Sequence, residues 1–189
     1  MTAVILAGGK SRRMKGHKAL LPVSGLRLIE KVARNIEDYF QEILISAHSK
    51  ELFDSLPYRV VIDNQRDQGP LMGILSGLQA CATPVNFVIA CDIPEIDTSF
   101  FQQMITYTGE YEIVVPVTGE NKFEPLFAFY NKNLIPRIED LLNHQTRQII
   151  KLFPMARVKY IPMADNGWLY NLNTESDYRD YLKNKGERK

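Results

Sequence analysis

Short apolar runs alternate along the chain with stretches in which apolar residues recur every three or four positions. The apolar runs are rich in branched residues and predict buried strands, whereas the wider spacing predicts amphipathic helices. Strands are expected at 2–5, 42–46, 59–63, 86–91, 112–117, 125–130 and 158–162. Helices are expected at 26–40, 50–56, 73–82, 98–107, 134–144, 147–153 and 174–185. This alternation predicts an α/β fold with a mostly parallel sheet and helices on both of its faces.

Composition adds little to the prediction of the fold, but it excludes some classes of function. The chain has 189 residues, which fits a single domain over residues 1–189. Its net charge of +1 gives no general attraction to nucleic acid or to a membrane surface, so neither is expected as a partner. No apolar run reaches the roughly 18 residues of a membrane span and no signal peptide is recognisable, which predicts a cytoplasmic protein. Cys81 and Cys91 are expected to be reduced core residues.

The first predicted strand runs into a glycine-rich, basic loop that is suited to holding phosphate groups. The loop reads Leu6-Ala7-Gly8-Gly9-Lys10-Ser11-Arg12-Arg13-Met14 and is followed by Lys18. Glycine lets a ligand approach backbone N–H groups, and the basic side chains supply positive charge for a triphosphate. The Walker A spacing and the G-x-G-x-x-G dinucleotide fingerprint are both absent. The alternative is a tight turn with solvated arginines, but the spacing favours a nucleotide site.

Polar residues follow several predicted strands, and in a parallel sheet those strand ends meet at one edge, where ligands bind. Asp63 ends the third strand, and Asp92 follows the fourth. A carboxylate in such a place can bind Mg²⁺ together with substrate phosphates, or it can cap a helix or a turn. Beside a phosphate loop, the metal site is the favoured role for Asp92. The pair Gly69-Pro70 is either a second place for close approach of a ligand or a simple turn before a helix.

Four motifs occur along the chain in the order L-A-G-G-x-S-x-R-M…K, D-x-x-x-x-x-G-P-L-x-G-I, C-D-x-P and N-x-N-T-x-x-D. Together they span residues 6–177 and resemble the molybdenum cofactor guanylyltransferase (MobA) family. The resemblance implies a three-layer, Rossmann-like nucleotidyltransferase fold and an enzyme that transfers GMP from GTP to molybdopterin, with release of pyrophosphate. It implies Mg²⁺ as the cofactor. It also implies other molybdenum cofactor synthesis proteins and molybdoenzyme chaperones as partners.

The resemblance further implies roles for individual residues. Lys18 contacts the phosphates of GTP, Asp92 binds the nucleotide-associated Mg²⁺, and Asn173 lies near the metal and the acceptor. The implied nucleotide-binding residues are Leu6, Ala7, Gly8, Gly9, Lys18, Asp63, Gly69, Pro70, Leu71, Gly73, Asp92 and Asn173. Arg13, Lys18 and Asp92 are expected to carry catalysis. Because a phosphate nucleophile is already ionised, positioning and charge neutralisation replace a strong general base.

Two positions of the loop depart from the family pattern, since Lys15 stands where glycine is usual and His17 where aspartate is usual. Two other functions therefore stay open. One is the same chemistry with CTP or UTP, acting on molybdopterin or on a sugar or alcohol phosphate. The other is a non-catalytic nucleotide-binding regulator, although the retained Lys18 and Asp92 favour an enzyme. The histidines at 17, 48 and 144 are too scattered along the sequence to indicate a metal cluster or a catalytic triad.

Overall fold

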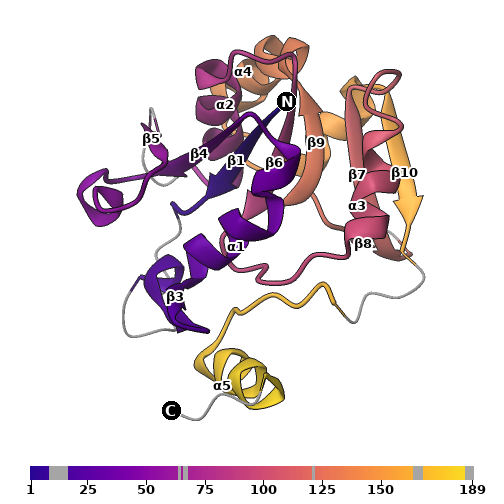
Figure 1. The fold of residues 1–189 in the computed structure, drawn as a ribbon. Coiled ribbons are helices and arrows are strands. Elements are labelled where there is room, and N and C mark those ends of the chain that lie inside the picture. Colours follow the sequence, from indigo (N-terminus) through magenta and orange to yellow (C-terminus); the bar gives the residue numbers. More distant parts are fainter. Residues whose placement is uncertain (9–16, 64, 66–67, 121, 164–167, 186–189) are drawn as a thin grey trace.

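The computed structural model describes residues 1–8, 17–63, 65, 68–120, 122–163 and 168–185 (Figure 1). The strands are β1 (Thr2–Leu6), β2 (Pro22–Val23), β3 (Leu26–Arg27), β4 (Glu42–Ala47), β5 (Arg59–Ile62), β6 (Val85–Ala90), β7 (Ile113–Gly119), β8 (Lys122–Phe123), β9 (Phe127–Asn131) and β10 (Val158–Pro162). The α-helices are α1 (Leu28–Ile36), α2 (Pro70–Ala80), α3 (Thr98–Ile105), α4 (Ile135–Asn143) and α5 (Glu175–Asn184). Segments of 3-10 helix are η1 (Lys18–Leu20), η2 (Glu37–Tyr39), η3 (Glu51–Phe53), η4 (Lys132–Leu134) and η5 (Ile149–Met155).

The main sheet has the strand order β10-β7-β9-β6-β1-β4-β5, and β8 pairs with β7. β1 is parallel to both of its neighbours, β4 and β6, and β4 is parallel to β5. β9 is the exception within this order, because it runs antiparallel to both β6 and β7. The carboxyl ends of β6, β1, β4 and β5 therefore lie at the same edge of the sheet, where the sequence predicts the ligand site.

Alternate residues of the central strand face opposite layers of helices. Ala3 and Ile5 are fully buried among residues of α1 and α3, whereas Val4 is buried among residues of α2 and α4. Figure 1 shows α1 and α3 in front of the sheet and α2 and α4 behind it. Because both faces are covered, the strands are apolar throughout rather than alternately polar. The predicted α/β class, with its mostly parallel sheet and three layers, is confirmed.

The last helix packs away from the sheet. α5 lies beside the small hairpin of β2 and β3 in Figure 1, and it shares a separate hydrophobic cluster with Val23 and Leu28. The hydroxyl of Tyr178 donates a hydrogen bond to the backbone carbonyl of Pro22. The C-terminal part of the chain is thus anchored on the segment that follows Lys18. Among the residues that the structure describes, every helix is too short or too polar to span a bilayer.

Most predicted elements are present with shifted ends, and the differences have local causes. The helix expected at 73–82 begins at Pro70, because Gly69 adopts φ 74° and turns the chain just before it, while a proline suits the first helical turn. The helix expected at 26–40 is shorter, since residues 26–27 pair in the hairpin and 37–39 tighten into η2. The helices expected at 50–56 and 147–153 are 3-10 segments.

Close packing of α2 on β1 gives a first testable prediction. A Cβ added at Gly77 would lie 2.6 Å from Cγ1 of Val4, closer than packed atoms allow. We expect Gly77→Ala to lower the free energy of unfolding by about 2 kcal/mol, measured by urea denaturation. Gly109→Ala is the matched control, because nothing lies within 4 Å of its added Cβ, and it should change stability by less than about 0.5 kcal/mol. Equal effects at the two glycines would contradict the packing.

Candidate active site

A cavity of about 510 Å³ opens at the carboxyl ends of the central parallel strands. It brings together most of the residues that the sequence assigns to the nucleotide site, although they are spread over the whole chain. These are Leu6, Ala7, Gly8, Lys18, Asp63, Gly69, Pro70, Gly73, Asp92 and Asn173. The side chain of Leu71 is instead fully buried in the cluster between α2 and the sheet. Gly9 and Arg13 lie outside the described residues.

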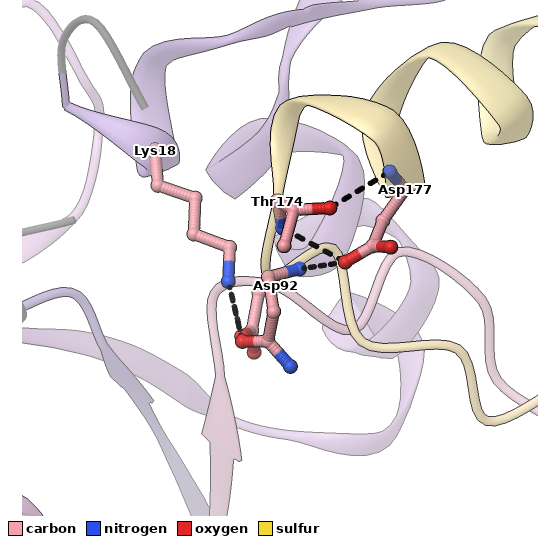
Figure 2. A network of polar contacts seen from close by, with 5 residues as sticks. Lys18, Asp92, Thr174 and Asp177 are labelled. Atoms are coloured by element: carbon pink, nitrogen blue, oxygen red, sulfur yellow. Dashed lines mark hydrogen bonds and ion pairs between the residues drawn. The ribbon is translucent and has the colours of Figure 1, made fainter. Parts of the chain in front are cut away.

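Three polar side chains meet on one wall of this cavity. Nζ of Lys18 lies 2.5 Å from Oδ2 of Asp92 and donates a hydrogen bond to Oδ1 of Asn173 at 3.1 Å. Figure 2 shows Lys18 reaching from the N-terminal part of the chain towards Asp92, with Thr174 and Asp177 of the C-terminal part on the other side. The side chains of Lys18 and Asp92 are only 13% and 17% exposed, so their attraction is weakly screened by water.

Backbone hydrogen bonds fix this wall of the cavity. The N–H of Cys91 donates to the carbonyl of Leu6 at 3.1 Å, which ties the exit of β6 to the end of β1. The N–H of Leu172 donates to the carbonyl of Asp92 at 3.0 Å, which brings the C-terminal segment to the same place. Lys18 begins η1 and its carbonyl accepts a hydrogen bond from the N–H of Leu21. Main-chain contacts therefore join the segments that carry Asp92 and Asn173. Lys18 reaches both of them through its side chain.

The carboxylate of Asp92 has a free coordination position. Its Oδ1 atom is buried and has no hydrogen-bond partner among the described residues, although a buried carboxylate oxygen normally has one. An amide oxygen, Oδ1 of Asn173, lies close to the same lysine. Carboxylate and amide oxygens suit Mg²⁺, which takes its remaining ligands from phosphates and water. No group of three or more His, Cys, Asp or Glu within the described ranges could hold a metal alone. The residues therefore fit a Mg²⁺ ion that is shared with a substrate.

A second polar cluster lies in the same cavity, at the ends of β4 and β5. Oγ of Ser46 donates a hydrogen bond to Oδ1 of Asp63 at 2.6 Å, and Nδ1 of His48 lies 3.2 Å from Oδ2 of the same carboxylate. Within the described part of the chain, the buried Nδ1 atom of His48 has no hydrogen-bond partner. A Cβ at Gly8 would lie 3.0 Å from Oδ2 of Asp63, and one at Gly73 would lie 3.0 Å from Oγ of Ser46. Small residues at both positions keep this part of the cavity open.

Burial of Asp63 makes the stability of the protein depend on pH. Burial raises the pKa of this carboxyl, and the hydrogen bond from Ser46 and the proximity of His48 offset the rise only in part. An acid with a raised folded-state pKa stabilises the fold below its unfolded-state pKa, and this contribution is lost as the pH rises through the folded-state value. As the pH rises above about 4, the unfolded-state pKa of an aspartate, we therefore expect the unfolding free energy of the wild type to fall relative to that of Asp63→Asn. Urea denaturation across this range measures the difference.

Asp97→Asn is the control for this pH dependence. Hydrogen bonds from the side chain of Ser99 and the backbone of Phe100 lower the pKa of Asp97, against a small opposing effect of burial. Its stabilisation is present above the unfolded-state pKa and is lost as the pH falls, so the difference from wild type should have the opposite sign. Slopes of the same sign for the two variants would show that the environment of Asp63 is misassigned.

Some residues of the cavity are not found by reasoning from the sequence. His48, Ala19 and Ala90 line it, and they belong to none of the predicted sites. His48 follows β4 directly, so its place at the carboxyl end of a parallel strand is the signal that could have found it. His17 also lines the cavity, whereas His144 contacts Asp140 on α4. Burial and the negative charge of Asp92 raise the pKa of the Glu124 carboxyl.

The comparison with known proteins agrees with this architecture. The family model described as "MobA-like NTP transferase domain" matches residues 3–158. A protein of Pelotomaculum thermopropionicum, described as a probable molybdenum cofactor guanylyltransferase, is 38% identical over 93% of this chain and 89% of its own length. One of Carboxydothermus hydrogenoformans with the same description is 34% identical over 97% of this chain and 95% of its own.

A solved structure supports the fold independently of these sequences. Molybdopterin-guanine dinucleotide biosynthesis protein A of Archaeoglobus fulgidus superposes with a TM-score of 0.82 over 98% of this chain and 99% of its own. Its sequence is only 19% identical, so this match concerns the fold alone.

Proposed function

Because the chain belongs to the family of MobA-like NTP transferases, and to the molybdenum cofactor guanylyltransferases within it, we propose that it transfers GMP from GTP to molybdopterin. The observation that carries the proposal is the meeting of Lys18, Asp92 and Asn173 on the wall of the cavity. A cation, a carboxylate with an unpartnered oxygen and an amide oxygen are the groups that a metal-bound triphosphate requires. The names of the sequence relatives support GTP and molybdopterin as the substrates.

The reaction that we propose is a displacement at the α-phosphorus of GTP. An oxygen of the terminal phosphate of molybdopterin forms a bond to the α-phosphorus, and the bond to the bridging oxygen of the β-phosphate breaks. Pyrophosphate leaves with the electron pair of that bond. Because the nucleophile is an ionised phosphate, no side chain has to remove a proton from it. The protein has to bring two anions together and neutralise the charge that develops on the leaving group.

The residues on this wall are suited to these tasks. Lys18 can exchange Asp92 for phosphate oxygens, since an ammonium is a compact charge on a flexible stem. Asp92 and the side-chain oxygen of Asn173 would hold Mg²⁺, which neutralises charge on the phosphates when it is bound. Because Gly8 has no Cβ to fill the space beside Asp63, the nucleotide can come close to backbone N–H groups there. Arg13 stays a prediction for an additional phosphate contact. The synthesis proteins and chaperones implied by the sequence resemblance are likewise proposed partners.

A panel of nucleotides tests the proposal and its alternatives. Purified protein with Mg²⁺ and molybdopterin is incubated separately with GTP, ATP, CTP and UTP, and pyrophosphate release is measured. We expect turnover with GTP and a strong preference for it over the other three. Exclusive turnover of CTP or UTP would instead assign a cytidylyl- or uridylyltransferase. Tight binding of GTP without pyrophosphate release, with acceptor present, would point to a non-catalytic regulator. Omission of Mg²⁺ should abolish the reaction.

A further inference from the structure

One carboxylate oxygen organises the backbone at the start of α5. Oδ2 of Asp177 accepts hydrogen bonds from the N–H of Asn173 at 2.9 Å and from the N–H of Thr174 at 2.8 Å. In return, the N–H of Asp177 donates to Oγ1 of Thr174 at 3.1 Å, which completes a capping box (Figure 2). The bond to Asn173 is not part of that box. It reaches one residue further, to the backbone of a residue that lines the cavity.

Asn173 is therefore held from two sides and connects α5 to the candidate active site. Its backbone N–H donates both to Asp177 and to the carbonyl of Asn171 at 2.9 Å, and its side-chain oxygen accepts the hydrogen bond from Lys18 at 3.1 Å. The preceding residue, Leu172, donates its N–H to the carbonyl of Asp92. Asn173 itself is exposed, so little packing would hold it if these hydrogen bonds were removed. The position of the amide oxygen relative to Lys18 and Asp92 depends on them.

Two backbone N–H groups, those of Asn173 and Thr174, converge on one carboxylate oxygen of Asp177. A carboxylate makes stronger hydrogen bonds to backbone N–H groups than a neutral acceptor does. Asp177 is therefore well suited to hold the backbone of Asn173 in place.

α5 is fixed independently on both segments that border the cavity. Tyr178 bonds to the backbone of Pro22, four residues after Lys18. On the other side, the hydroxyl of Tyr181 donates to Oε1 of Glu95 at 2.6 Å, three residues after Asp92. A helix that is attached to both neighbours is a rigid support for the loop at its N-terminus, and rigid elements hold functional groups more precisely than loops do.

We propose that Asp177 is a positioning residue, which sets the place of Asn173 and through it the geometry of Lys18 and Asp92. This inference rests on the proposed function, since it assigns to those three residues a common task in nucleotidyl transfer. The competing explanation is that Asp177 only caps α5 and contributes to stability. The two explanations differ at Thr174, whose side chain belongs to the cap but makes no bond to Asn173 among the contacts of the described residues.

The test compares Asp177→Ala with Thr174→Ala in the full-length chain. Both variants lose a capping interaction and should lower Tm by similar amounts. Asp177→Ala should also lower kcat about tenfold or more, with the KM for GTP changed less. Displacement of the groups that contact the phosphates raises the energy of the transition state more than it weakens the binding of GTP. Thr174→Ala should keep kcat within about twofold of wild type, the scale of a small structural effect. Asp177→Asn, which retains an acceptor oxygen, should recover most of the lost kcat.

Crystal structures of the two alanine variants provide a measurement that needs no reaction. In Asp177→Ala the amide oxygen of Asn173 should leave hydrogen-bond distance of Nζ of Lys18, and in Thr174→Ala it should stay near the 3.1 Å of the wild type. A retained contact in Asp177→Ala overturns the positioning role, as does an equal loss of kcat in the two variants. A wild type that turns over no nucleotide refutes the proposed function instead, and the two crystal structures then still decide the role of Asp177.

Discussion

Asp92→Asn should lower kcat/KM for GTP about a thousandfold, the largest effect expected of any single substitution in this chain. The substitution preserves the shape of the side chain but removes its negative charge. An amide is a poor ligand for Mg²⁺ compared with a carboxylate, and the unpartnered Oδ1 atom is the position that the ion would use. Steady-state kinetics of pyrophosphate release, at several concentrations of Mg²⁺, measures the loss.

Asp180→Asn is the matched control for this substitution. Asp180 lies on α5, where its side chain is 55% exposed and pairs with Lys183. The same chemical change there should leave kcat/KM within about twofold of wild type, as expected for an exposed pair. The measured Mg²⁺ requirement should also rise in Asp92→Asn and not in the control. If Asp92→Asn retained wild-type activity at low Mg²⁺, Asp92 would be a structural turn residue, which is the alternative that its sequence context allows.

Lys18→Ala should give the second largest effect, a fall in kcat of about a hundredfold. Lys18 is the only lysine or arginine among the described residues that line the cavity. Its loss removes the positive charge that would stabilise the developing pyrophosphate, and it leaves Asp92 without its ion-pair partner. Kinetics with saturating GTP measures the fall in kcat, and calorimetry with GTP and Mg²⁺ measures the accompanying loss of affinity.

Two further variants make the interpretation of Lys18 specific. Lys18→Arg keeps the charge but replaces a compact ammonium by a planar guanidinium, so its kcat should lie between those of wild type and Lys18→Ala. Lys183→Ala removes a lysine whose side chain is 75% exposed and pairs only with Asp180 within the described residues, so it should behave like wild type. An alanine at position 18 that left kcat unchanged would exclude Lys18 from catalysis.

The hydrophobic pattern predicts the layers of the fold well because it reports burial directly. β1 is an example, since its uninterrupted apolar run requires cover on both faces, and helices cover both faces. The hydrophobic pattern does not reveal whether a strand runs parallel or antiparallel to its neighbours. β9 is antiparallel to both neighbours, although its sequence resembles those of the parallel strands. The two-residue strands β2 and β3 are too short for any periodicity to detect.

The candidate site was predictable where a residue follows a strand or belongs to a recognisable motif. Lys18, Asp92 and Asn173 were expected in one site, and their side chains are in contact. The pairing of Ser46 and His48 with Asp63 was not expected, because it depends on the parallel register of β4 and β5, which brings together residues far apart in the sequence. The role proposed for Asp177 likewise depends on hydrogen-bond geometry that a motif cannot supply. The roles assigned to all of the site residues stay predictions, and Gly9 and Arg13 lie outside the described residues.

The central claim is that this chain transfers the α-phosphate of GTP, with its nucleoside, to molybdopterin. The most direct measurement follows GTP labelled with ³²P at either the α or the γ position, incubated with the protein, Mg²⁺ and molybdopterin, and separates the products. We predict that the α label appears in a dinucleotide product and the γ label in pyrophosphate, and that Asp92→Asn suppresses both. Transfer of the γ label to the acceptor, or the absence of any labelled dinucleotide, would contradict the account.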